Sequence, residues 1–160
     1  MNGVKRGIQF LSRMALTFLF VFVLLIFVVQ KATVDGRSME TTFYDGDGVW
    51  VDKFSYRFTT PKRYDVIIFW HEADESYYIK RIIGLPGETV EIKDGIPYIN
   101  DVALAENYGS GERQGNMDPV TLDAGTYFVM GDNRNNSLDS RSSMVGAVSR
   151  DTIIGRVVFP

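Results

Sequence analysis

The stretch YYIKRIIGLPG, at positions 77–87, predicts a buried β-strand that ends in a tight turn. Its first seven residues are mostly aromatic or β-branched, and the Leu-Pro-Gly at its end favours a turn. Side chains alternate between the two faces of a strand, so Lys80 shares one face with Tyr78 and Ile82, while Arg81 lies on the other. At least one of these two cations must therefore lie among apolar side chains.

Burial would change the chemistry of Lys80. An apolar environment disfavours the ammonium and lowers the lysine pKa, which can leave a neutral amine near physiological pH. Lowering the pKa from its usual ~10.4 to near physiological pH requires that the ammonium be destabilised by roughly 3–4 kcal/mol. The alternative is a lysine on an edge strand, whose ammonium reaches water, and the strand pattern alone leaves both open.

The chain beyond residue 31 consists of short β-rich runs separated by turn signals, without helical periodicity. Asp94-Gly95 is a hairpin signal between two such runs, and the polar, glycine-containing segment 104–119 is expected to be a surface excursion. The expected strands are residues 33–37, 48–56, 65–70, 77–84, 89–93, 96–100, 126–130 and 152–159. This pattern predicts an all-β fold, a compact coiled sheet or barrel.

Residues 14–30, MALTFLFVFVLLIFVVQ, carry no charge and predict a transmembrane helix. Seventeen helical residues span about 25 Å, and the flanking Arg13 and Lys31 can extend outward to reach the polar interfaces. The alternative is a cleaved secretory signal, but the run is longer than the usual apolar region of about 7–15 residues and lacks a clean small-x-small site after it.

Charge is distributed unevenly around this segment. Residues 1–31 hold four of the 17 basic residues and none of the 20 acidic ones, a balance of +4 against −7 for the remainder. Three of the four cations precede the apolar run, so the basic N-terminus 1–13 is expected in the cytoplasm. Residues 14–30 would then be a single anchor in the cell membrane, and residues 32–160 an extracytoplasmic, β-rich domain.

Composition excludes several kinds of site. The chain has no cysteine and one histidine, His71. These counts exclude disulfides, thiolate zinc sites and multi-histidine metal sites. Acidic pairs such as Asp45 and Asp47 lie in turns without metal-loop spacing, so neither a metal nor a cofactor is expected. The acidic balance of the larger segment makes a nucleic-acid partner unfavourable.

Three other polar features stand out. Ser38 follows Gly-Arg at the end of an expected strand, where a hydroxyl lies beside free backbone N–H groups. The polar segment 131–141, GDNRNNSLDSR, directly follows an apolar strand and is either a solvated turn or a functional loop. His71 begins an acidic turn and is expected to be solvated. Ser38 and Lys80 are 42 residues apart, so spacing cannot pair them.

Together these segments resemble the bacterial type I signal peptidases of the short Gram-positive kind. The anchor is followed by GRSMETTFYDGD at 36–47, which is similar to the family's nucleophile box, and by YDVIIF at 64–69. YIKRIIGLPGE at 78–88 matches the general-base box, and 131–141 matches the last box. Four boxes in the family's order, with the anchor, cover most of the chain.

The resemblance implies a Ser-Lys dyad, with Ser38 as nucleophile and Lys80 as general base. It implies an oxyanion hole formed by the backbone N–H of Ser38, with Gly36 where many relatives have a hydroxyl, so that a second donor would be a backbone N–H or absent. Ser137, Asp139 and Arg141 match positions that support the dyad.

The implied substrate is an exported preprotein, whose extended segment adds as a strand beside residues 33–37. Small residues at −1 and −3 from the cut would enter shallow apolar pockets. By family position these pockets involve Val34, Met39, Phe43, Tyr78 and Ile79.

The chain departs from the family pattern at three positions. Thr41 replaces a usual proline, Phe43 a usual leucine and Asn135 a usual aspartate. The family's large extra β domain is also missing. These departures affect specificity and rate more than the reaction.

Two alternatives differ in function class. One is a membrane-anchored accessory protein for pilus assembly that keeps the peptidase fold and acts by binding; retention of Ser38 and Lys80 argues against it. The other is a soluble Ser-Lys autoprotease of the repressor-cleaving kind, which the anchor disfavours. Membrane lipid is an expected partner, and a link to the secretion translocon or to pilus assembly stays open.

Overall fold

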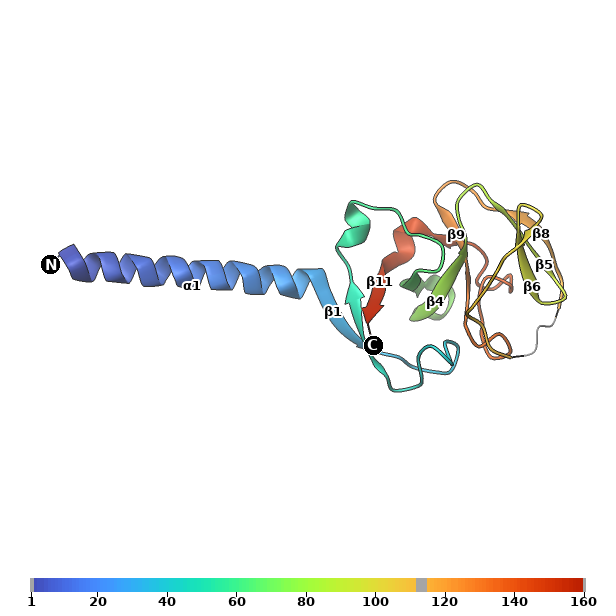
Figure 1. Cartoon of the computed structure of the whole chain (residues 1–160), viewed down its shortest axis with the longest axis horizontal. Helices are drawn as coiled ribbons and strands as arrows, with labels where there is room; N and C mark the ends of the chain where they lie inside the picture. Colours follow the sequence, from blue (N-terminus) through green and yellow to red (C-terminus); the bar gives the residue numbers. More distant parts are fainter. Residues whose placement is uncertain (1, 112–114, 160) are drawn as a thin grey trace.

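The computed structural model describes residues 2–111 and 115–159, and consists of one long helix attached to a β-rich domain. Helix α1, Asn2–Val28, projects away from the domain (Figure 1). Its stretch Lys5–Val23 is long and apolar enough to cross a membrane, and no part of the domain covers it. The 27 residues of α1 correspond to about 40 Å of helix, more than the ~30 Å hydrocarbon core.

The helix is offset from the segment 14–30 expected from the sequence. It begins twelve residues earlier, because the basic N-terminal residues continue the same helix. It ends at Val28, so Val29 and Gln30 belong instead to the first strand, β1, Val29–Thr33. The chain therefore passes from α1 into the sheet without a linker.

Two antiparallel sheets form the domain. The larger has the strand order β1-β2-β11-β3-β4-β9-β10 and the smaller β7-β6-β5-β8. In the large sheet, the strands after β1 are β2 Gly48–Asp52, β3 Val66–His71, β4 Ser76–Gly84, β9 Thr126–Met130, β10 Val148–Ser149 and β11 Ile153–Phe159. In the small sheet they are β5 Thr89–Lys93, β6 Ile96–Ile99, β7 Val102–Ala103 and β8 Met117–Thr121. Three short 3₁₀ helices, η1 Ser55–Arg57, η2 Glu72–Asp74 and η3 Arg150–Thr152, connect them.

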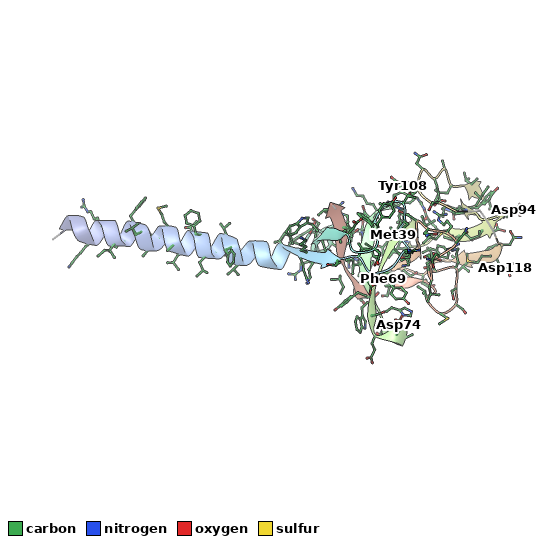
Figure 2. The ribbon with its side chains drawn as sticks, turned by 90° about the horizontal axis from the view of Figure 1, so that it is seen from below. Met39, Phe69, Asp74, Asp94, Tyr108 and Asp118 are labelled. Carbon is green, nitrogen blue, oxygen red and sulfur yellow. The ribbon has the colours of Figure 1, made fainter. Side chains whose placement is uncertain are left out.

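The expected all-β class is confirmed, as one coiled sheet with a smaller one beside it. Among the described residues the large sheet ends at β1 and β10, so it does not close into a barrel. The small sheet lies at the end of the domain far from α1 (Figure 1), and Figure 2 shows Asp94 and Asp118 at this same end.

Seven of the expected strands are present with small shifts, and one is wrong. The strand expected at 33–37 instead ends at Thr33, because Gly36 has φ +89° and the chain turns there. Strands β7, β8 and β10 were missed. Strand β8 overlaps the segment 104–119 expected to be an irregular excursion, and its largely exposed residues give little apolar pattern.

Strand β4 lies between two apolar clusters, which explains why its sequence is apolar on both faces. Ile82 packs with Phe69 and Val129 on one side. Ile83 packs with Val90 and Phe128 on the other. A third cluster, centred on Met39 and Val49, lies under the loop that follows β1. Lys80 and Arg81 are 4% and 5% exposed, so both cations are buried, rather than only one.

Gly84 ends β4 where the two sheets meet, and we expect Gly84→Ala to destabilise the fold. A Cβ there would lie 2.5 Å from Val90 Cγ2 and 2.9 Å from both Leu122 Cδ1 and Phe128 Cβ. Overpacking of this kind costs about 1–3 kcal/mol. Urea unfolding in detergent, followed by tryptophan fluorescence, measures the loss. The exposed substitution Val102→Ala is the control, and equal midpoints for the two variants would contradict the prediction.

Candidate active site

Ser38 lies in the loop 34–47 between β1 and β2, and this loop is closed like a hairpin. The Val34 N–H donates to the Asp47 carbonyl at 2.8 Å, and the Gly46 N–H donates back to the Val34 carbonyl at 2.9 Å. Met39, next to Ser38, is fully buried in the cluster below the loop and anchors it from within (Figure 2). Ser38 is therefore held on a turn whose base is packed.

The loop brings Ser38 against Lys80. The Nζ atom of Lys80 is 2.7 Å from Ser38 Oγ and 2.9 Å from the Ile79 carbonyl. Lys80 is central in β4 and almost completely buried, with the Tyr78 ring centroid 5.1 Å from its Nζ. The two residues that spacing could not pair are thus in direct hydrogen-bond contact.

Burial lowers the pKa of Lys80 from 10.5 to about 8, although the charge of Asp139 opposes this shift. The cause is desolvation, because the ammonium loses water and gains only a hydroxyl and a carbonyl as acceptors. A substantial share of the Lys80 side chains is therefore neutral just above neutral pH. A neutral amine 2.7 Å from a hydroxyl can accept its proton.

The polar segment 131–141 forms a wall behind this pair, organised around Asp139. Ser137 Oγ donates to Asp139 Oδ2 at 2.7 Å and the Gly131 N–H donates to the same atom at 2.9 Å. Arg141 donates to both carboxylate oxygens. Burial alone would raise the pKa of Asp139, but these hydrogen bonds outweigh it and hold the pKa below its usual value. Asp139 is therefore a fixed negative charge near Lys80.

Gly131 lets this wall approach the serine loop closely. A Cβ on Gly131 would collide with the Ser137 side chain and would lie 2.5 Å from the Ser38 carbonyl oxygen. The Ser38 carbonyl also accepts the Asn133 N–H at 3.0 Å. Ser137 thus lies beside Ser38, yet in residues 2–111 and 115–159 its hydroxyl bonds to Asp139 and not to Lys80.

A buried ion pair that was not predicted from the sequence connects the loop 34–47 to β4. Arg81 donates to Asp132 at 2.8 and 2.6 Å, and both side chains are nearly inaccessible to solvent. Thr42, in the serine loop, donates to the same carboxylate at 2.5 Å. Removing one partner of such a pair leaves an uncompensated buried charge. In the sequence, Arg81 stands out as a cation in an apolar strand and Asp132 belongs to the polar segment 131–141, whereas Thr42 carries no signal of its own.

A groove of about 830 Å³ opens in front of Ser38 and Lys80. Residues 32–35 line one side and residues 76–80 the other, with Val49, Val51, Ile68 and Ile153 among the apolar lining. Of the five expected pocket residues, Val34, Tyr78 and Ile79 line the groove. Met39 and Phe43 do not: both are buried in the cluster beneath it and shape the groove from below.

The N–H of Ser38 itself is open to a substrate. Among the described residues, the Ser38 N–H has no hydrogen-bond acceptor within the protein. The Gly36 N–H, expected as a second donor, instead donates to Asp45 Oδ1 at 2.9 Å. The carboxylate of Asp45 thus occupies it and holds the left-handed turn at Gly36.

His71 belongs to a second polar network beside the groove. Its Nδ1 is 2.6 Å from Asp74 Oδ1 and its Nε2 is 3.1 Å from the Met144 carbonyl. Its ring stacks on Tyr78, with 4.9 Å between centroids, and the Tyr78 hydroxyl donates to Asp74. Figure 2 shows Asp74 at the periphery of the domain. The expectation of a solvated histidine is wrong, because His71 is 9% exposed.

This network predicts a histidine contribution to stability that decreases as pH rises. The hydrogen bond with Asp74 raises the pKa of His71 above its usual 6.5. The contribution is therefore complete below about pH 6.5 and is lost as pH rises through the folded-state pKa. Urea unfolding at several pH values measures it. We expect His71→Phe, which keeps the stacked ring, to remove this slope; an unchanged slope would contradict the assignment.

Comparisons with known proteins agree with this geometry. The family described as signal peptidase, peptidase S26, matches residues 7–160. Signal peptidase I T of Bacillus subtilis (strain 168) is 39% identical over 143 residues, covering 83% of this chain and 74% of the relative. Signal peptidase I P of Bacillus subtilis subsp. natto is 31% identical over 166 residues, 96% of this chain and 89% of the relative.

A solved structure is also similar. The crystal structure of a signal peptidase I from Enterococcus faecalis V583 is 35% identical in sequence and aligns with a TM-score of 0.54. The alignment covers 62% of this chain and 98% of that one. The match therefore extends to backbone arrangement over more than half of the chain. With the family match and the Bacillus relatives, it shows that the chain belongs to the peptidase S26 family of signal peptidases.

Proposed function

We propose that this protein is a membrane-anchored serine endopeptidase that removes signal peptides from exported preproteins, with Ser38 as nucleophile and Lys80 as general base. One observation carries the proposal: the 2.7 Å contact between Ser38 Oγ and the Nζ atom of a buried lysine. A serine is a weak nucleophile until a neighbouring base takes its proton. Desolvation, which brings the pKa of Lys80 to about 8, supplies that base.

In the proposed reaction, neutral Lys80 takes the Ser38 proton as Oγ attacks the scissile carbonyl. The Ser38 N–H donates to the oxyanion that forms. When the C–N bond breaks, Lys80 gives its proton to the leaving amine, and the signal peptide stays bound to Ser38 as an ester. Lys80 then takes a proton from water as the resulting hydroxide attacks the ester carbon, and it returns that proton to Ser38 Oγ when the C–O bond breaks and the signal peptide leaves as a carboxylate. The fixed charge of Asp139 favours the lysine cation that forms in each half.

Two open strand edges support binding of an extended substrate. Strand β1 is the outer strand of the large sheet and, among the described residues, pairs only with β2. In the same part of the chain, β4 pairs with β9 only from Arg81 onward, which leaves the edge of residues 76–79 without a neighbouring strand beside the groove. A preprotein segment between these edges could bond to both backbones. The apolar groove beside Val34, Tyr78 and Ile79 suits small side chains at −1 and −3.

The anchor fits this substrate. Helix α1 and the signal peptidase relatives indicate a membrane-anchored protein. We propose a single span with a cytoplasmic N-terminus, because Lys5, Arg6 and Arg13 precede the most apolar part of the helix. The domain then lies outside the cytoplasm, on the side where exported preproteins are cleaved. The accessory role in pilus assembly finds no support, since the relatives named above are peptidases and both dyad residues are in contact.

Removal of either dyad side chain should abolish cleavage. With the full chain in detergent and a preprotein carrying a small-x-small site, we expect Ser38→Ala and Lys80→Ala each to lower kcat/KM by at least about 10³-fold. Ser143→Ala and Lys62→Ala, which change exposed residues of the same types, are matched controls. A Lys80→Ala variant with near-normal turnover would refute the general-base role. Preprotein binding without turnover by the unmodified protein would favour the accessory role instead.

Activity should also follow the protonation of Lys80. Because its pKa is about 8 and the neutral form is the base, kcat/KM should rise about tenfold per pH unit below that value and level off above it. Initial rates between about pH 6 and 9.5, with folding monitored at each pH, measure the profile. A rate that is flat across this range would be inconsistent with a lysine base.

A further inference from the structure

The groove is strongly asymmetric in charge. Asp35 is the acidic residue that lines it, near Ser38. Lys53, Arg57 and Arg150 also line it, and we call these three residues the cationic end. Lys53 Nζ is 3.0 Å from Gln30 Oε1, at the start of β1, and Arg150 donates to the Tyr56 carbonyl beside Arg57. The three cations therefore surround the part of the groove beside the start of β1, whereas Ser38 lies beyond the end of that strand.

These cations have no carboxylate partner. Within residues 2–111 and 115–159, none of the three forms an ion pair. Their polar contacts are neutral, with the Gln30 amide and the Tyr56 carbonyl. Of the neighbouring acids, Asp52 accepts from Ser55 and Asp65 accepts from Tyr56, while the exposed Asp151, next to Arg150, forms no ion pair within the described residues. The cationic end thus presents positive charge that no ion pair neutralises to whatever occupies the groove.

The cationic end also lies next to the membrane anchor. The Lys53 N–H donates to the Val28 carbonyl at 3.0 Å, so Lys53 abuts the last residue of α1. Figure 1 shows the segment after β2, which contains η1, on the side of the domain that faces α1. A preprotein whose apolar segment is in the same membrane would enter the groove from this side. Its residues before the cut would pass the cationic end before they reach Ser38.

The distance along the groove gives the approximate position, relative to the cut, of the substrate residue that lies beside the cationic end. Val34 is four positions after Gln30, which corresponds to roughly 13 Å of extended chain at ~3.3 Å per residue. If the −1 and −3 side chains lie near Val34, a side chain beside Gln30 and Lys53 belongs to a residue about five to seven positions before the cut.

We propose that the cationic end is a subsite for a carboxylate side chain of the preprotein, about five to seven residues before the cleaved bond. The proposal rests on the proposed function, because the direction of the substrate follows from cleavage at Ser38. The subsite is distant from the reacting atoms, so it contributes to binding and acts on KM rather than on kcat. Partly exposed ion pairs contribute modestly, so the preference amounts to about threefold to tenfold.

Substrates that differ in one charge test the subsite. Preproteins identical at −1 and −3 carry Glu, Gln or Lys at positions −5, −6 or −7, and the full chain cleaves them in neutral detergent. We expect Glu at one of these positions to raise kcat/KM about threefold to tenfold over Gln, Lys to lower it, and about 0.5 M salt to reduce the difference. The double variant K53E/R57E should reverse the order, whereas Lys62→Glu, an exposed cation outside the groove, should keep it.

The outcomes separate this subsite from the proposed function. If no preprotein is cleaved, the proposed function itself fails. Equal cleavage of the Glu and Gln substrates at all three positions would overturn the subsite alone. An unchanged order in K53E/R57E, together with weaker binding of this variant to vesicles containing anionic lipid, would also overturn it. The cations would then contact the membrane surface rather than the substrate.

Discussion

The removal of the Lys80 ammonium from water is the interaction on which the arrangement of the site depends. The side chain is 4% exposed, and among the described residues its hydrogen-bond partners are one hydroxyl and one carbonyl. A pKa lowered from 10.5 to about 8 corresponds to about 3 kcal/mol against the charged form at neutral pH. The fold must compensate for this cost elsewhere, and apolar clusters on both faces of β4 provide the packing.

The buried charged residues around Lys80 form ion pairs, whereas Lys80 forms none among the described residues. Arg81, its neighbour in β4, is equally buried but is fully paired with Asp132, and Asp139 is paired with Arg141. Thr42, in the loop that carries Ser38, donates a hydrogen bond to Asp132 of the ion pair with Arg81. The Asn133 N–H, in the polar wall, donates to the Ser38 carbonyl of the same loop. The loop, the strand and the wall therefore position one another. Lys80 is left next to a hydroxyl that a substrate can reach through the groove.

How far the sequence predicts this site depends on the range of each contact. The mostly aromatic and β-branched residues along 77–83 predict the buried strand, because apolar side chains on both faces are visible in the local sequence. It cannot pair Lys80 with Ser38, since that contact depends on how the loop 34–47 folds back; only the family resemblance suggested it. Met39 and Phe43 were expected in the groove wall by family position but are buried in the cluster beneath it, because the way the loop packs is not contained in a matched position. Strand β8 was missed since its exposed residues carry no apolar pattern.

The central claim is that Lys80 is a neutral base near physiological pH, and a direct titration tests it. In the full chain in detergent, with ¹³C-labelled lysine, NMR follows each side-chain methylene next to the amine as pH is raised. The resonance that is missing from Lys80→Met should titrate with a midpoint of about 8, well below the usual lysine pKa of ~10.4. A Lys80 resonance that titrates above about 10 would contradict the account.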